Sequence, residues 1–470
     1  MLIRTKDAAI EYEQDTSGIF QFTEGGPTLL LDGDPIAYSS ASACDSAEHN
    51  IKLNGTTIYT IQGGLTELYS ALGFNDYRDF GAMLEKNPDI TYEKVVTSDD
   101  SRNMFHTIKA QIRKIIKRTG AGDVRIYLTD GATNFRITEG IATVLKYKGN
   151  RSSDSKPQML GKARDYMVEE LGAIMCSGYE ADDALAIEHR NAWKQAMEEA
   201  AEFYAPEKVS TEQLEKKAME LSKTILCTID KDIKMVAGKF LNPDQDLGIE
   251  NIYPLGSLFL EVKSDSKKLR FNGLKGFYAQ LLMGDATDHI PSVYFCGDTR
   301  TYEVLKDCEN EEQLFKATLR EIYQGFHREH LRARDSDIMS RVDVAIASGL
   351  HGNDNPSNRA KVKKKIKDSL DKTIAYGNKH YYHWTLYKEN DDGTVSKELK
   401  DPSTAKPLQI TPIGYMIEVA RLVYMLDVYP DNCTSSHLWK FTPEMEKWAS
   451  QVVSEFEEEN LMRVSTEWVL

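Results

Sequence analysis

Acidic residues are the side chains of this sequence whose spacing could do chemistry. Three aspartates each follow directly on an apolar run: Asp32 after 28–31, Asp130 after 124–129, and Asp230 after 224–229. Each run is typical of a buried strand that ends in a carboxylate. In an open α/β sheet, ligands bind in the crevice at the carboxyl ends of the strands. We therefore expect the three carboxylates to converge on one side of one sheet.

Six more acids extend this set. An apolar helix is expected to begin with Glu180, Asp182 and Asp183. Asp232 lies two residues after Asp230, which is the same spacing as that of Glu180 and Asp182. A further helical stretch is followed by Asp285 and Asp288. Two carboxylates about 4 Å apart repel by roughly 4 kcal/mol at an effective dielectric near 20. Such a cluster needs either raised pKa values or a divalent cation. Any one aspartate taken alone also fits a plain loop or cap role.

The ligand types select the ion and its chemistry. Carboxylate oxygens with few nearby histidines favour Mg²⁺, with Mn²⁺ as a substitute, over zinc. A pair of such ions stabilises both the attacking and the leaving oxygen of a phosphodiester. The acidic set therefore predicts phosphodiester hydrolysis.

The elements that must position these acids alternate between strands and helices. Isoleucines recur at helical spacing over 104–118, and further helices are expected over 160–171 and 180–203. About thirty residues around the break at 206–216, before the strand that begins at Thr224, are interpreted as an insertion. The pattern predicts an α/β fold with a central, mostly parallel sheet. A long apolar helix is expected over 411–428 in a mainly helical C-terminal region.

Composition limits the class of protein. The 470 residues, 41% of them hydrophobic, suffice for two or three domains with real cores. No segment is apolar enough for a membrane span or a signal peptide, so a cytoplasmic protein is expected. Six cysteines without paired spacing predict buried free thiols.

The charge is unevenly distributed. A net charge of −15 argues against a protein that simply coats nucleic acid. Basic residues nevertheless cluster at 109–118, 146–151 and 361–367. The last cluster fits a contact with a DNA backbone and a solvated helix face equally well.

Six motifs occur in the order and approximate spacing of the 5′ nuclease family, which this chain resembles. They span Leu30–Tyr38, Thr129–Arg136, Tyr147–Arg151, Glu180–Asp183, Thr228–Asp232 and Gly284–Pro291. The family includes flap endonucleases, the 5′ nuclease domain of bacterial DNA polymerase I and the phage 5′ to 3′ exonucleases, to which the resemblance is closest. The resemblance covers about residues 29–305.

The resemblance implies a PIN-like core, a helical arch and a helix-three-turn-helix element that grips duplex DNA. With these elements the chain divides into an N-terminal extension (1–27), a catalytic domain (28–264), a helix-three-turn-helix region (265–330) and a C-terminal region of unknown role (331–470).

The resemblance also assigns the acids to two ions. Asp32, Asp130, Glu180 and Asp182 would hold the first, and Asp182, Asp183, Asp230, Asp232 and Asp285 would hold or approach the second, with Asp288 at its outer edge. Lys148 would stabilise charge that develops on the phosphate. Its other interpretation is a solvated lysine in a polar turn.

DNA contacts follow from the same resemblance. Arg136 and Arg151 would bind phosphates, and Tyr38 would stack on a terminal base unless it belongs to the core. The family's arginine after this tyrosine is replaced by Ser39. The family has a glycine-rich turn between its two DNA-gripping helices, and of its glycines only Gly297 is kept in this chain. Asp298 adds a negative charge at this turn, which Arg300 could offset. K⁺ bound at the turn is a further expectation.

These features together predict a Mg²⁺-dependent 5′ to 3′ exonuclease of phage or bacterial DNA replication. Its substrates would be DNA with 5′ ends, nicks or flaps, and RNA–DNA hybrids if it has RNase H-like activity. Two alternatives remain open at this point. One is a PIN-type ribonuclease, and the other is a non-catalytic module that binds DNA junctions.

Overall fold

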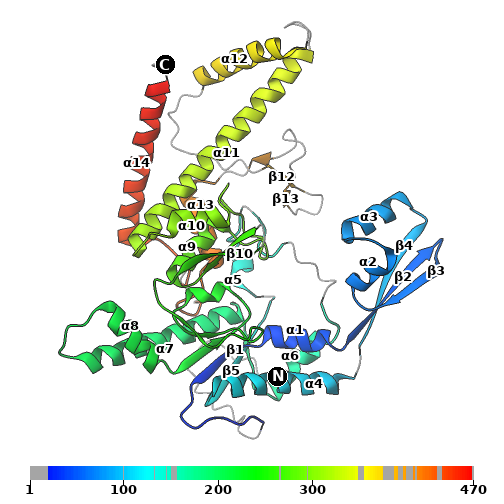
Figure 1. The fold of residues 1–470 in the computed structure, drawn as a ribbon, viewed down its shortest axis with the longest axis vertical. Coiled ribbons are helices and arrows are strands. Elements are labelled where there is room, and N and C mark those ends of the chain that lie inside the picture. The colour runs from blue at the N-terminus through cyan, green and yellow to red at the C-terminus, as the bar shows by residue number, and fades with distance from the viewer. Residues whose placement is uncertain are drawn as a thin grey trace. The chain divides into compact units, whose positions relative to one another are not determined.

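The protein is represented by a computed structural model in which two compact units are distinguished (Figure 1). Unit 1 comprises Met1–Gly131, Ser152–Ile229 and Gly238–Glu250, and unit 2 comprises Ala132–Arg151, Asp230–Ala237 and Asn251–Leu470. The structure describes residues 19–98, 100–131, 133–143, 145–149, 156–263, 266–293, 295–347, 354–373, 386–389, 395–397, 406–407, 410–430 and 437–467.

The central sheet of unit 1 is built from apolar runs. Its strands follow the order β6–β5–β1–β7–β8. They are β1 (Thr28–Asp32), β5 (Asp123–Thr129), β6 (Ile174–Cys176), β7 (Thr224–Cys227) and β8 (Gly238–Leu241). Every neighbouring pair is parallel. This confirms the expected α/β class and the three strands predicted to end near Asp32, Asp130 and Asp230.

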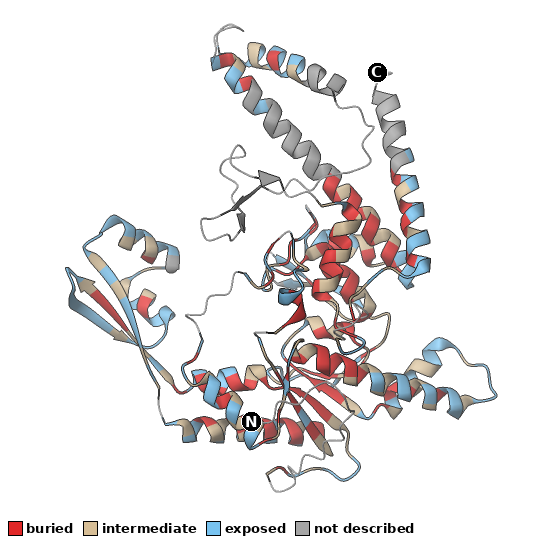
Figure 2. Cartoon of the chain, turned by 180° about the vertical axis from the view of Figure 1, so that it is seen from behind, coloured by how far each residue is buried: buried red, intermediate tan, exposed pale blue. Residues whose placement is uncertain are grey.

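Helices bury the apolar faces of these strands. Leu29 and Leu31 of β1 and Ile126 of β5 are at most 1% exposed and belong to the main core of the unit. The surrounding helices are α1 (Asp34–Ser42), α4 (Ser101–Thr119), α6 (Leu160–Glu169), α7 (Ala181–Tyr204) and α8 (Thr211–Leu221). Ile108 and Ile112 of α4 are fully buried, as their helical spacing predicts. Buried residues follow the strands in Figure 2.

A small α/β insert lies between α1 and α4 and was not expected from the sequence. Its antiparallel strands have the order β3–β2–β4, and two helices cover one face. The elements are β2 (Asp45–Leu53), β3 (Thr56–Gln62), α2 (Leu65–Leu72), α3 (Tyr77–Lys86) and β4 (Ile90–Ser98). Ile51, Leu68 and Phe80 form its core.

Unit 2 is mainly helical. The helices are α5 (Phe135–Thr138), α9 (Gly273–Met283), α10 (Asp298–Leu305), α11 (Glu311–Ala347), α12 (Pro356–Thr373), α13 (Pro412–Val423) and α14 (Pro443–Glu467), with the 3-10 helix η2 (Asp232–Met235). The strands are the hairpin β10 (Leu258–Lys263) and β11 (Ser266–Phe271), and β12 (Leu386–Glu389), β13 (Val395–Lys397) and β14 (Lys406–Pro407). β9 (Glu250–Ile252) begins at the last residue of unit 1.

The predicted apolar helix near the C-terminus is α13, which ends at Val423 rather than 428. Tyr415, Val419 and Ala420 on it are at most 1% exposed. None of the helices in the described ranges combines the length and the apolar character needed to cross a membrane. The five cysteines in those ranges are free and buried, as predicted, and Cys433 lies outside them.

Candidate active site

Two acids of unit 1 lie at the carboxyl ends of adjacent parallel strands. Asp32 is the last residue of β1 and is 7% exposed. Its carboxylate accepts a hydrogen bond of 2.8 Å from the Thr228 hydroxyl, just beyond β7, and one of 3.1 Å from the Asp34 amide. Asp130 follows β5, and its amide donates to the Cys176 carbonyl at the end of β6. The parallel register therefore gathers two of the three carboxylates expected at this edge of the sheet.

The first turn of α7 brings three more acids to the same edge. The Ala181 amide donates a 2.9 Å hydrogen bond to the Thr129 hydroxyl, which ties the start of α7 to the end of β5. Glu180 is the N-cap residue, and the Asp183 carboxylate accepts from its amide at 3.1 Å. This capping box satisfies otherwise unpaired amides. Asp183 is completely buried, whereas Glu180 and Asp182 are partly exposed.

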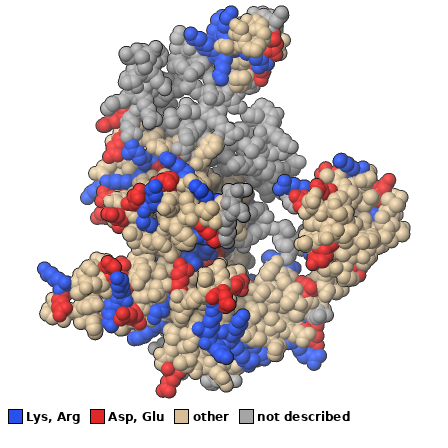
Figure 3. All heavy atoms as spheres, viewed as in Figure 1, with Lys and Arg blue, Asp and Glu red and all other residues tan. Residues whose placement is uncertain are grey.

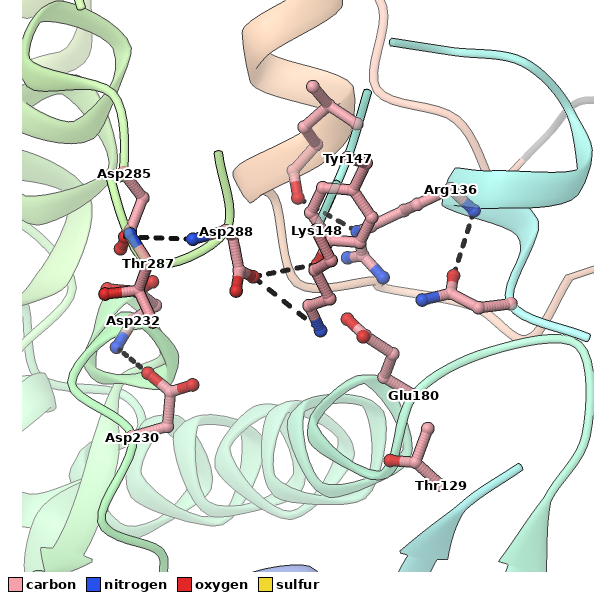
Figure 4. A network of polar contacts seen from close by, with 12 residues as sticks. Thr129, Arg136, Tyr147, Lys148, Glu180, Asp230, Asp232, Asp285, Thr287 and Asp288 are labelled. Atoms are coloured by element: carbon pink, nitrogen blue, oxygen red, sulfur yellow. Dashed lines mark hydrogen bonds and ion pairs between the residues drawn. The ribbon is translucent and has the colours of Figure 1, made fainter. Parts of the chain in front are cut away.

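The acids of unit 2 form a second group around Asp230, Asp232 and Asp285 (Figure 4). The Asp230 carboxylate accepts a 2.8 Å hydrogen bond from the Asp232 amide. The Asp232 and Asp285 side chains share a hydrogen bond, and Lys231 lies 3.2 Å from Asp285 and 3.7 Å from Asp232. Gly284 carries a φ of +59°, and a Cβ there would lie 2.3 Å from the Pro291 carbonyl oxygen. Only glycine therefore allows the turn that presents Asp285.

Burial and mutual repulsion change the acidity of this group. Burial, together with the charge of Asp230, raises the pKa of Asp232 well above its ordinary value. Burial also raises the pKa of Asp230. Burial acts in the same direction on Asp285, but Lys231 and hydrogen bonds outweigh it and lower its pKa. The raised pKa of Asp232 favours its protonated form, and the ammonium of Lys231 offsets part of the negative charge of the group.

Lys148 lies beside the same segment of unit 2. Its amide donates to the Asp288 carbonyl at 2.9 Å, and its Nζ lies 3.7 Å from the Asp288 carboxylate. The Tyr147 hydroxyl donates to that carboxylate at 3.0 Å (Figure 4). His289 adds a 3.1 Å contact to the Lys146 carbonyl. Two motifs that are far apart in the sequence are therefore in direct contact, and Asp288 orients the Lys148 side chain.

The turn before α10 differs from the expected phosphate site. Gly297 is the N-cap residue of α10 and has open space around its Cα. The Asp298 carboxylate accepts from the Leu269 amide at 2.7 Å and lies 3.6 Å from Lys268. Arg300 donates two hydrogen bonds, of 2.6 and 3.1 Å, to the buried Glu321. Asp298 and Arg300 therefore hold neighbouring elements together, and K⁺ at this turn stays a prediction.

The remaining predicted DNA contacts have different surroundings. Arg136 is 1% exposed, and its guanidinium donates 2.9 Å hydrogen bonds to the Leu422 and Tyr424 carbonyls at the end of α13. The structure thus gives Arg136 a capping role and not the expected phosphate contact. Tyr38 is 44% exposed on α1, as base stacking would require. Arg151 lies outside the described residues.

The donor set suits a hard divalent ion, although the acids are not arranged around one. Within the described ranges, no three His, Cys, Asp or Glu side chains are grouped as the ligands of a metal. Carboxylate oxygens are nevertheless the ligands that Mg²⁺ prefers. A cation would also favour the ionised forms of Asp230 and Asp232, whose pKa values are raised by burial first and by neighbouring charges second.

Sequence reasoning missed several residues that shape these two acid groups. Asp34 accepts from the Thr129 amide at 2.9 Å and lies 3.6 Å from Arg164. Thr228 and Lys231 hold Asp32 and Asp285 as described above. The signal for Asp34 and Lys231 was their position between or beside the acids of the same short motifs. Nothing local marked Thr228.

Comparison with known proteins adds no relative. No protein-family model matches the chain, and no curated protein does so either.

Proposed function

We propose that this chain is a Mg²⁺-dependent 5′ to 3′ exonuclease with a PIN-like 5′ nuclease core, acting on DNA ends in replication. The observation that carries the proposal is the edge of the unit 1 sheet. Asp32 and Asp130 end adjacent parallel strands there, and Glu180 and Asp182 enter from the start of α7, which is bonded to Thr129. Carboxylates collected in this way suit ions that bind phosphate oxygens.

The acids of unit 2 support the same chemistry. In the proposed enzyme, Asp32, Asp130, Glu180 and Asp182 would hold one ion, and Asp230, Asp232 and Asp285 would hold another. Mg²⁺ would supply positive charge for the attacking and departing oxygens of the scissile phosphodiester. The protein's own part is to collect carboxylates that are otherwise costly to bury, and Lys231 contacts two of them.

Lys148 is the side chain that we assign to the phosphate. Its side chain is 21% exposed and is oriented by Asp288, which also accepts a hydrogen bond from Tyr147. A lysine in this position would offset charge on the non-bridging phosphate oxygens as that charge grows in the transition state. Asp288 is therefore proposed as a positioning residue first, with an outer role at the second ion.

The deciding experiment compares cleavage of 5′-labelled nicked, flapped, blunt and RNA-primed duplexes in Mg²⁺. We expect mononucleotides or short products released from the 5′ end, and their loss in EDTA and in Asp230→Asn. Asp246→Asn is the matched control, because Asp246 is exposed and has no place in the proposed site. It should cleave like the wild type.

Other outcomes identify the rival functions. Cleavage of single-stranded RNA alone would favour a PIN-type ribonuclease. Tight binding to branched DNA without any cleavage would favour a junction-binding module. Equal cleavage by the wild type and Asp230→Asn would refute the assignment of the acids.

A further inference from the structure

Helix α12 carries a group of lysines, here named the α12 lysines, that no described residue neutralises. They are all exposed and occupy four of five consecutive positions: Lys361, Lys363, Lys364 and Lys365. Val362, which is 5% exposed, and Ile366 pack against Val342 and Ile346 of α11. This apolar contact fixes the rotation of α12 and turns the lysines away from α11.

Two described acids beside the start of α12 already have a cationic partner. Arg359 binds Asp354 at 2.6 Å and Asp343 at 2.7 Å. No described carboxylate lies within ion-pair distance of an α12 lysine. Figure 3 shows the resulting gathering of Lys and Arg side chains over α12.

The basic residues of α4 behave differently, which makes the α12 lysines distinctive. Arg118 donates to the Pro243 carbonyl at 3.3 Å, and Arg113 donates to the Ile19 carbonyl at 3.2 Å. Lys109 lies over the Tyr166 ring. These cations stabilise their own unit, whereas the α12 lysines contribute no described contact to the fold.

We propose that the α12 lysines dock onto the phosphate backbone of duplex DNA. Four adjacent cations that pair with no described carboxylate form a local field that attracts a polyanion, although the chain has a net charge of −15. Residues 356–373 contain no aromatic residue, whereas single strands are bound largely by base stacking on aromatic rings. Protein interfaces are depleted in lysine, so an acidic protein is a poorer match. The choice of DNA over duplex RNA rests on the proposed nuclease function.

The test is DNA binding in EDTA, where no cleavage is required. The variant replaces all four α12 lysines by glutamine. The control removes four exposed lysines elsewhere, at Lys114, Lys117, Lys194 and Lys208. The two variants have the same net charge, so a difference between them reports position. Circular dichroism and thermal melting check that both keep the wild-type fold.

We expect the α12 variant to bind a blunt DNA duplex at least about tenfold more weakly than the control at about 0.1 M salt. The slope of log K against log salt should also shrink by about 3 to 4, since each lost phosphate contact removes about 0.9. Equal binding by the two variants, or no binding of DNA by the wild type, would overturn the proposal. So would stronger competition by duplex RNA or polyglutamate than by DNA.

The two proposals fail separately. A protein that shows the α12 effect but cuts no substrate keeps the docking surface and loses the nuclease function. A protein that cuts DNA with no α12 effect keeps the nuclease function and loses the surface.

Discussion

The buried guanidinium of Arg136 caps the C-terminal end of α13. It donates to the Leu422 and Tyr424 carbonyls and lies over the Phe135 ring at 4.6 Å. Arg136→Ala leaves both carbonyls without these donors in a water-poor site, so we expect unfolding free energy to fall by about 2–4 kcal/mol. Arg136→Lys should recover only part of the loss, because one ammonium cannot reproduce the planar fork. Urea unfolding measures both variants.

Arg102→Ala is the control for Arg136, since Arg102 is largely exposed and pairs only with its neighbour Asp100. Its unfolding midpoint should match the wild type. If Arg136→Ala kept full stability but lost DNA affinity, the phosphate contact expected from the sequence would be correct and the capping role wrong.

His189 makes the stability of unit 1 depend on pH. Burial, with nearby Arg190 and Lys239, lowers the pKa of His189 to about 4. In the unfolded chain a histidine has a pKa of about 6.5, so between these values the unfolded state binds more protons. The contribution of neutral His189 to the unfolding free energy is therefore fully present above about pH 6.5 and is lost as the pH falls toward 4. From pH 7 to pH 5 we expect a loss of about 2 kcal/mol.

Urea unfolding of the wild type and His189→Gln at both pH values isolates this histidine, because other titrating groups are common to both proteins. The wild type should lose about 2 kcal/mol more than the variant. Parallel losses in the two proteins would show that His189 is not buried in its neutral form.

Lys148 is the single side chain whose removal should affect the proposed chemistry most cleanly. Because it is partly exposed, Lys148→Ala should fold normally. We expect kcat on a 5′-labelled duplex to fall about 10²- to 10³-fold with a smaller change in DNA affinity, since the charge it offsets develops in the transition state. Single-turnover kinetics with saturating enzyme measure this.

Lys146→Ala provides the matched control, because Lys146 is an exposed lysine in the same turn. An equal loss of rate in both variants would assign the effect to general charge and not to the contact of Lys148 with Asp288.

Strand β8 and helix α7 pack so closely at Gly238 that no room remains for an added methyl group. Gly238, the first residue of β8, has a φ of +133°, and a Cβ there would lie 2.1 Å from Nε2 of His189 on α7. The same ring is held by the Thr224 hydroxyl at 2.8 Å, so it cannot move away without losing that bond. Gly238→Ala should therefore lower unfolding free energy by about 3 kcal/mol or more.

Gly248→Ala tests the same change where nothing lies within 4 Å of the added Cβ. It should leave the thermal melting midpoint close to that of the wild type. A small effect at Gly238 would mean that His189 and β8 are not packed together in solution.

The elements that could be predicted are those whose own residues show a clear apolar run or a clear helical spacing of apolar residues. The apolar runs of β1, β5 and β7 and the isoleucine spacing of α4 gave their type and place. The insert could not be predicted in this way, because its strand β2 buries polar His49, which contacts the Tyr92 hydroxyl at 2.8 Å and the Gly63 carbonyl at 3.0 Å. Such a strand lacks a clear apolar pattern.

The acids of the candidate site were predictable for the same reason, since they lie just after a strand or a helix or at the start of a helix. The basic residues were not. Arg136 finds its acceptors 286 and 288 residues away, and Arg300 finds Glu321 on another helix. A long cation can serve a phosphate or its own fold, and only the tertiary structure decides between them.

At the scale of the whole molecule, the chain passes between its two units more than once. The peptide bond between Ile229 and Asp230 joins the last residue of one segment of unit 1 to the first of a segment of unit 2. Neither unit is therefore a continuous stretch that a single cut would release. The proposed function requires acids of both, so Asp130→Asn and Asp230→Asn should each abolish cleavage.

If the acids bind Mg²⁺, replacing one of them should change both the stability of the protein without the ion and the stabilisation that the ion gives. At pH 7 the Asp232 carboxyl group opposes folding, because its pKa is raised in the folded state above that of the unfolded chain. In EDTA, Asp232→Asn should therefore be more stable than the wild type. Added Mg²⁺ should stabilise the wild type by about 1.4 kcal/mol when its concentration is about ten times Kd. The variant, which lacks one ligand charge, should gain less.

Thermal melting with and without Mg²⁺ measures both effects, with Asp246→Asn as a control that should follow the wild type under each condition. The informative result is a pair of opposite effects: Asp232→Asn raises the melting temperature in EDTA and reduces the stabilisation that Mg²⁺ gives. A variant that is less stable in EDTA would mean that Asp232 forms favourable contacts in the metal-free protein. Equal gains from Mg²⁺ in all three proteins would exclude Asp232 as a ligand, because an ion bound elsewhere would not distinguish them.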